Sequence, residues 1–227
     1  MTQGAGSLEF FAFYDANATS GAVAPCASGG LTLAPFTFGA SGPTSTLAYP
    51  DTVGATISQT TGFTLFTHYI NTTSSPIMTH VSLTLYTAVA GAVTQHAGAI
   101  FLDNTTMSVP PGTQKSTASY TLAQSVNILA STSEMAQAAT NFTATAGSQT
   151  LFTTTEWNQP PTTVFATPLA IPTGTLITWS CTDNNVTGTT LAFGESIRTN
   201  VKCVSLSFFY PVSDVTNPVI GNTGGSL

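Results

Sequence analysis

Hydrophobic and polar residues alternate with a period of two along much of this chain. In one segment near the C-terminus, Ile177, Trp179 and Cys181 occupy alternate positions. In a second segment, Val204 and Leu206 also occupy alternate positions. In both segments the positions between these residues carry small polar side chains. Such alternation is typical of β-strands that bury one face and leave the other wetter. We therefore predict two half-buried strands here, around which the rest of the fold is arranged.

The same pattern predicts about ten or eleven strands in the whole chain. The longest clean alternation covers residues 77–90, where Val81, Leu83 and Leu85 stand at alternate positions. The Ala-rich residues 130–146 are the one segment that fits a short helix instead. The other predicted strands cover residues 8–14, 31–38, 63–70, 94–102, 116–129, 150–154, 164–170 and 190–193.

Many short strands with turn residues between them are typical of an all-β sandwich or barrel. A jelly roll fits this number of strands better than an immunoglobulin fold, which has seven to nine strands in about 100 residues. We predict a single antiparallel β-sandwich of the jelly-roll type over residues 22–211. Residues 1–21 are expected to form a flexible arm with a short aromatic strand, and residues 212–227 a loosely held tail.

Charged residues are scarce, and hydroxyl side chains replace them. Only 5% of the residues are charged, against about 25% in a typical globular protein, whereas the chain has 44 Thr and 22 Ser. Three basic residues and a net charge of −6 argue against nucleic acid and anionic membranes as partners. The chain has no run of 18 consecutive apolar residues, so the sequence predicts no membrane-spanning helix. A surface with so little charge is poorly protected against self-association, which favours a protein that packs against copies of itself.

No pattern of residues predicts a catalytic, cofactor or metal site. The three histidines, His68, His80 and His96, lack the spacing of metal ligands. The nine acidic residues are scattered singly, and no nucleophile elbow or phosphate-binding glycine loop is present. The sequence therefore favours a protein that is not an enzyme.

Three cysteines leave the disulfide pairing open. A bond between Cys181 and Cys203 is one alternative, but Cys181 shares its face with Trp179, whereas Cys203 falls on the face opposite Val204. Cys26 lies in a segment of small residues, where a bond between two molecules is a second alternative. Three small buried thiols are the interpretation that we favour.

Five sequons for N-glycosylation are present. About three are expected by chance in a chain this rich in Ser and Thr, so coincidence is favoured over glycosylation. The sequons begin at Asn17, Asn71, Asn104, Asn141 and Asn185.

Three segments carry a resemblance to a known family. They are residues 22–30 (AVAPCASGG), residues 83–87 (LTLYT), and residues 168–176 (PLAIPTGTL) followed by 193–194 and 201–208. Together they resemble the C-terminal domain of collagen-like exosporium glycoproteins, which cover the surface of spores. The resemblance implies a trimeric jelly roll of the complement and tumour-necrosis-factor type, assembled without a secretory signal. The chain departs from the family in two ways: it has no Gly-X-Y stalk, and Leu176 follows Thr175 where the family has Arg.

These observations lead to the hypothesis of a structural, self-assembling surface protein. It would form a homo-oligomer, filament or shell at a spore surface or another extracellular surface. The aromatic segment of the arm is predicted to add as a strand to the sheet of a neighbouring subunit. A viral capsid or spike protein is an alternative, and so is a carbohydrate-binding module that uses Trp157 and Tyr210. The residues of the predicted inter-subunit strand are Leu8, Phe10, Phe11, Phe13 and Tyr14.

Overall fold

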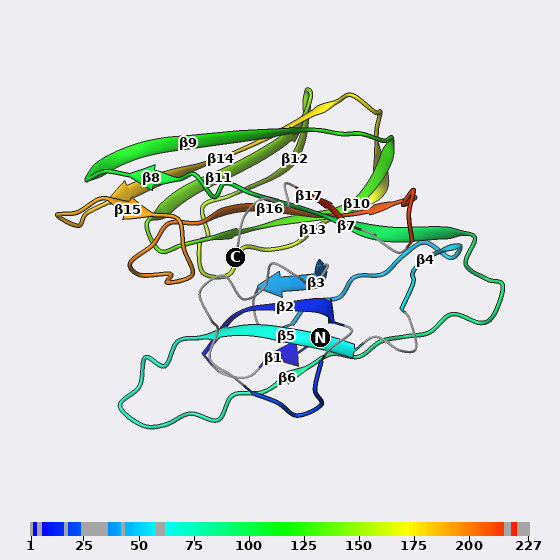
Figure 1. Cartoon of the computed structure of the whole chain (residues 1–227), viewed down its shortest axis with the longest axis horizontal. Coiled ribbons are helices and arrows are strands. Elements are labelled where there is room, and N and C mark those ends of the chain that lie inside the picture. Colours follow the sequence, from blue (N-terminus) through cyan, green and yellow to red (C-terminus); the bar gives the residue numbers. More distant parts are fainter. Residues whose placement is uncertain are drawn as a thin grey trace.

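The computed structural model of the chain shows an all-β fold in three layers (Figure 1). The structure describes residues 2–3, 6–15, 18–23, 36–41, 44–57, 62–215 and 219–221. Within these ranges every regular element is a strand, and nearly all pairs are antiparallel. The prediction of an antiparallel all-β fold is thus confirmed.

Eight strands of the C-terminal part form two packed sheets. Counted along the chain, the first pairs with the eighth, the second with the seventh, the third with the sixth and the fourth with the fifth. This nested pairing is that of a jelly roll, as predicted. The outer sheet has the order β12-β11-β14-β9, and the middle sheet has the order β13-β10-β16-β7. The eight strands are β7 (Gln95–Asp103), β9 (Gly112–Thr121), β10 (Val126–Met135), β11 (Ala139–Ala146), β12 (Gln149–Thr154), β13 (Thr163–Ile171), β14 (Leu176–Asn185) and β16 (Cys203–Tyr210).

A third sheet from the N-terminal part covers the other face of the middle sheet (Figure 1). It consists of β2 (Ser7–Asp15), β3 (Phe36–Ser41) and β5 (Gly62–Tyr69) in the order β3-β2-β5. The other six strands of the described residues are short. They are β1 (Thr2–Gln3), which pairs with β6 (Val81–Ser82); β4 (Val53–Ala55) and β17 (Val219–Gly221), which pair with β7 in parallel; and β8 (Ser108–Val109), which pairs with β15 (Leu191–Ala192).

The middle sheet is therefore buried on both faces, and β16 shows this most clearly. Cys203 and Phe209 belong to the core between the middle and outer sheets. Leu206 and Phe208 belong to a second core, which they share with Phe36 and other aromatic side chains of the third sheet. The prediction that β16 has one wetter face was wrong, because the third sheet covers that face.

Two predicted elements differ in the structure. Residues 130–146 form no helix but the second half of β10 and the whole of β11, which lie in the middle and the outer sheet. Small side chains such as Ala144 are needed where these sheets pack closely, and packing overrides helix propensity. In the predicted strand at 77–90 only Val81 and Ser82 are paired. In the predicted tail, β17 is a paired strand rather than loosely held chain.

The aromatic segment near the N-terminus is part of the core rather than a free arm. Strand β2 pairs with β3 along one edge and with β5 along the other. Phe10, Phe11 and Phe13 are no more than 2% exposed. The prediction of an inter-subunit strand at Leu8–Tyr14 is corrected accordingly, since both edges of this strand are already occupied within the chain.

Candidate functional site

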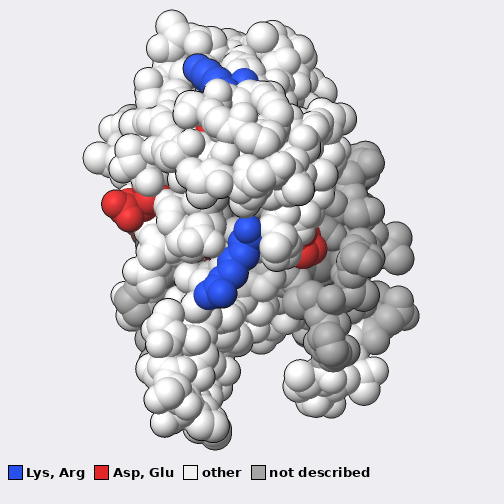
Figure 2. Space-filling view, turned by 90° about the vertical axis from the view of Figure 1, so that its left-hand side faces the viewer, with Lys and Arg blue, Asp and Glu red and all other residues white. Residues whose placement is uncertain are grey.

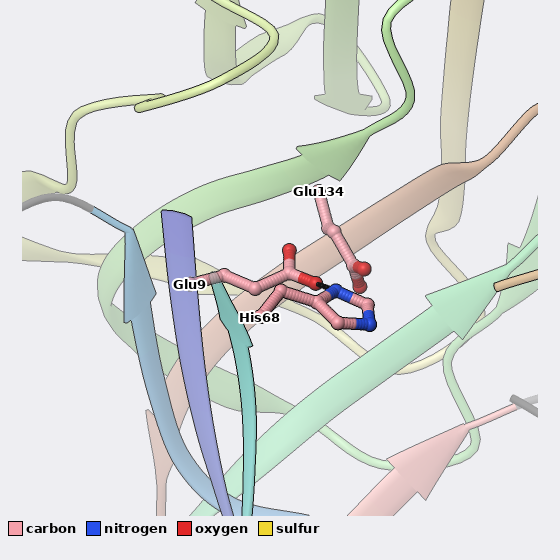
Figure 3. A group of neighbouring side chains, drawn as sticks. All are labelled: Glu9, His68 and Glu134. Carbon is pink, nitrogen blue, oxygen red and sulfur yellow. Dashed lines mark hydrogen bonds and ion pairs between the residues drawn. The ribbon is translucent and has the colours of Figure 1, made fainter. Parts of the chain in front are cut away.

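Five ionisable side chains meet where the middle and third sheets pack together. Glu9 comes from β2, His68 from β5 and Glu134 from β10, and Figure 3 shows these three side chains pointing toward one another. Lys202 immediately precedes β16, and Glu195 lies between β15 and β16. We call these five residues the buried charge cluster.

Lys202 lies at the centre of the hydrogen bonds in this cluster. Its Nζ donates to Glu134 Oε1 at 2.6 Å and to Glu195 Oε2 at 3.0 Å. On the side of the third sheet, His68 Nδ1 is hydrogen-bonded to Glu9 Oε1. The side chains of Lys202 and Glu134 are each only 2% exposed. The cluster therefore buries Lys202 and Glu134 between two layers of the fold, whereas the side chains of His68 and Glu195 at its rim are 19% and 20% exposed.

Burial and mutual charge shift the pKa values of three of these groups. Burial raises the pKa of Glu9, but the hydrogen bond with His68 and the charge of Lys202 outweigh it, so the pKa is lowered. Burial and the negative charge of Glu9 together raise the pKa of Glu134 well above its usual range. Burial lowers the pKa of Lys202, but the charges of Glu134, Glu9 and Glu195 outweigh it and raise the pKa. Lys202 therefore stays charged, and Glu134 is the carboxyl that most readily takes up a proton.

The arrangement suits a structural ion network better than a reaction centre. Ligand atoms of Glu9, His68 and Glu134 lie within 4.8 Å of one another, and these residue types can bind a divalent cation. Here the ammonium group of Lys202 already supplies a positive charge at Glu134. Glu9 and Glu134 are 5% and 2% exposed, so a substrate has no direct access to them. What the cluster can do is tie β2 and β5 to the middle sheet by charge.

Sequence reasoning did not find this cluster, because its members come from distant parts of the chain. Glu9 stands alone in an aromatic strand, and Glu134 stands alone in a run of small and apolar residues. That isolation was the available signal: a charge within a hydrophobic strand, in a chain with few charges, has to find a buried partner. Of the other histidines, His80 is exposed and His96 Nδ1 is hydrogen-bonded to Thr56.

A disulfide joins Cys181 of the outer sheet to Cys203 of the middle sheet, with 5.8 Å between the Cα atoms. Beside it, Trp179 Nε1 donates a hydrogen bond to the carbonyl oxygen of Cys203 at 3.1 Å. From the sequence, this disulfide was the less favoured alternative. The alternation in β16 was interpreted as one buried face with Val204, which placed Cys203 on the opposite, wetter face. Both cysteines point into the core between the two sheets, so the pairing is geometrically allowed. Cys26 lies outside the described residues.

The sequons occupy different environments. Asn71 is exposed, Asn104 is 9% exposed, Asn141 is half-buried, and Asn17 lies outside the described residues. Asn185 is 2% exposed, and its Nδ2 donates hydrogen bonds to the carbonyl oxygens of Val109 and Thr189. Asn185 is therefore unsuited to carry a glycan in this fold, because its amide nitrogen is used inside the protein.

Comparison with known proteins adds no assignment. No protein-family model and no curated protein sequence matches this chain. Within the described ranges, no helix has the length and apolar character needed to cross a membrane. The resemblance to exosporium glycoproteins stays a prediction.

Proposed function

We propose that this protein is a structural, self-associating subunit without catalytic activity. The observation that carries the proposal is its nearly uncharged surface. Of the twelve charged residues in the chain, five are buried in the part that the structure describes: Glu9, Asp103, Glu134, Asp183 and Lys202. Figure 2 shows one face of the molecule, on which blue and red atoms are sparse among uncharged ones. A soluble monomer normally keeps charge on its surface to prevent association.

The exposed face of the outer sheet fits the same role. Along β9 every second residue is exposed, and from Thr117 to Thr121 these residues carry hydroxyl groups. Across the sheet, Thr117 pairs with Ser180, which is only 7% exposed, and Ser180 pairs with the half-buried Thr143. The exposed hydroxyl groups of this face therefore lie mainly along β9. Hydroxyl groups keep such a face wettable without adding repulsion between copies, which suits a subunit that packs side by side with others.

A carbohydrate-binding module finds less support. That function needs an exposed aromatic platform, and Trp157 was one of the two candidates. Trp157 is partly buried and packs against the core between the outer and middle sheets. A spore surface and a viral particle both remain compatible with a structural subunit.

Light scattering coupled to size-exclusion chromatography tests the proposal. The purified chain is expected to form dimers or larger species as its concentration rises. Raising the salt concentration from 0.1 to 1 M should not dissociate them, because salt screens charge–charge contacts and few charges are available. A chain that remains monomeric at millimolar concentration would overturn the proposal.

A further inference from the structure

The buried charge cluster contains a carboxylate oxygen that has no partner. Lys202 Nζ donates to Glu134 Oε1, whereas Glu134 Oε2 is buried and has no hydrogen-bond partner among the described residues. The side chain of Glu134 is only 2% exposed, and Figure 3 shows its carboxylate turned toward the side chains of His68 and Glu9. A buried carboxylate oxygen costs free energy unless a proton or a cation meets it. This oxygen therefore indicates an occupant between the three side chains.

The charges of the cluster do not balance. Glu9, Glu134 and Glu195 supply three carboxylates, and Lys202 supplies one ammonium group, which it shares between Glu134 and Glu195. Two negative charges are therefore without a counter-charge when His68 is neutral. A proton on Glu134 would remove one of them, whereas a divalent cation would remove both. Buried charges in proteins are generally paired or bind metal ions.

The residue types and their distances fit a divalent transition-metal ion. Zn²⁺ binds imidazole nitrogens and carboxylate oxygens at about 2.0–2.2 Å, so two of its ligand atoms are at most about 4.4 Å apart. Ligand atoms of Glu9, His68 and Glu134 lie within 4.8 Å of one another, so small side-chain rotations bring all three to one ion. Mg²⁺ and Ca²⁺ take oxygen ligands, and the imidazole of His68 therefore favours Zn²⁺. Lys202 holds the other oxygen of Glu134, as neighbouring groups commonly do for ligating carboxylates.

We propose that Glu9, His68 and Glu134 bind one Zn²⁺ ion. The ion takes the place of the proton between His68 Nδ1 and Glu9 Oε1 and contacts the unpaired Oε2 of Glu134. Its role is structural, since it joins β2 and β5 of the third sheet to β10 of the middle sheet between buried carboxylates. The side chain of His68 is 19% exposed, so the ion can enter at this rim of the cluster. This inference goes beyond the proposed function and does not depend on self-association.

Isothermal titration calorimetry with Zn²⁺ tests the site. Metal is first removed from the proteins with a chelator, and every protein carries Cys26→Ser, because a free thiol also binds Zn²⁺. This parent chain is expected to bind one ion, with an affinity that falls at least about tenfold in His68→Gln and in Glu9→Gln. His80→Gln is the matched control, because His80 is exposed and lies outside the cluster, and it should bind Zn²⁺ as the parent chain does.

The ring signals of the three histidines in NMR spectra give a second measurement, which needs no change in the cluster. His68 is identified by elimination, with His80→Gln and His96→Gln assigning the other two rings. Its signals are expected to shift and to saturate at one Zn²⁺ per parent chain. This measurement decides the question even where His68→Gln or Glu9→Gln does not fold, as judged by circular dichroism without metal.

Three results would overturn the proposal. The first is a parent chain that binds no Zn²⁺ at millimolar ion concentration. The second is folded His68→Gln and Glu9→Gln variants that bind as tightly as the parent chain, which would place the ion elsewhere. The third is a set of His68 ring signals that do not change while Zn²⁺ binds.

Discussion

Lys202 donates a 2.6 Å hydrogen bond to Glu134 across neighbouring parts of the middle sheet, and each side chain is only 2% exposed. Breaking a buried ion pair by removing one partner costs about 3–5 kcal/mol, because the other charge is left without compensation. Replacing both partners by uncharged residues of similar size is often neutral. This asymmetry gives a sharp test of the cluster.

Lys202→Met is expected to lower the free energy of unfolding by about 3–5 kcal/mol, because Glu134 and Glu195 lose their shared cation. The double variant Lys202→Met with Glu134→Gln should recover a large part of this loss. Urea denaturation at pH 7 measures both. Lys115→Met, at an exposed position of β9, is the control and should change stability by less than about 0.5 kcal/mol. A single variant no worse than this control would show that the ion pair is not important for stability.

Glu9→Gln tests the contact between the third sheet and the cluster. Because the pKa of Glu9 is lowered, its ionised carboxylate stabilises the folded protein at pH values above the ordinary pKa of 4.5. This stabilisation is lost as the pH falls through the pKa that Glu9 has in the folded protein. The variant should be less stable by about 1.5–3 kcal/mol at pH 7, since a hydrogen bond to a charged group is lost. The difference should shrink toward pH 3.

The charge of Glu9 contributes to the raised pKa of Glu134, so the difference between variant and wild type reports the ionisation of Glu9 together with its coupling to Glu134. Urea midpoints at pH 7 and pH 3 give the measurement. Glu156→Gln, at an exposed position, is the control. A Glu9→Gln deficit that is equal at both pH values would contradict the ionic role.

Asp183 is another buried acid, and it lies on the same face of β14 as Trp179 and Cys181, toward the core between the outer and middle sheets. It is 0% exposed, and neither carboxylate oxygen has a hydrogen-bond partner among the described residues. Burial raises its pKa to about 6. Because of this raised pKa, the protonated carboxyl of Asp183 stabilises the folded protein fully at pH values below 3.8, the pKa in the unfolded chain. This contribution is lost as the pH rises through about 6.

Asp183→Asn removes this titration. On going from pH 4 to pH 7.5, the wild type should lose about 2 kcal/mol more stability than the variant. Chemical denaturation of both proteins at the two pH values gives this double difference, in which all other titrating groups cancel. Equal losses in the two proteins would mean that Asp183 is solvated or paired in the folded state.

Reduction of the bond between Cys181 and Cys203 is expected to cost about 3 kcal/mol, the loop-closure term for a short loop at a sequence separation of 22. Thermal unfolding with and without a reducing agent measures this cost. The variant Cys181→Ala with Cys203→Ala should unfold at the lower temperature in both conditions. A wild type insensitive to reductant would show that the bond is not formed in solution.

The jelly roll could be predicted from the sequence because its strands carry a strong local signal. Short alternating segments such as 177–182, separated by turn residues, indicate strands wherever they lie, and their number favours a jelly roll. The helix at 130–146 was wrong because Ala favours a helix locally, while close packing between sheets also requires small side chains. The prediction of a strand at 77–90 was wrong for another reason. The hydrophobic pattern favours a strand, but it does not show whether a neighbouring strand is present to pair with it, and only Val81 and Ser82 are paired.

The candidate site could not be predicted because ion pairing is a property of distance in space. Glu9 and Lys202 stand at opposite ends of the chain, and only the stacking of the third sheet on the middle sheet brings them into one cluster. The disulfide was misjudged for a related reason. The third sheet buries Val204 and Leu206 on one face of β16, so their alternation did not reveal that the opposite face, with Cys203, is buried as well.

The sequence by itself determined that this chain is all-β, poor in charge and coated with hydroxyl groups, because strand periodicity and composition are local properties. Only the tertiary structure decided which faces are buried, which cysteines bond and where the few charges meet. Those outcomes depend on contacts between the three layers of strands, and these contacts join residues that no local pattern connects.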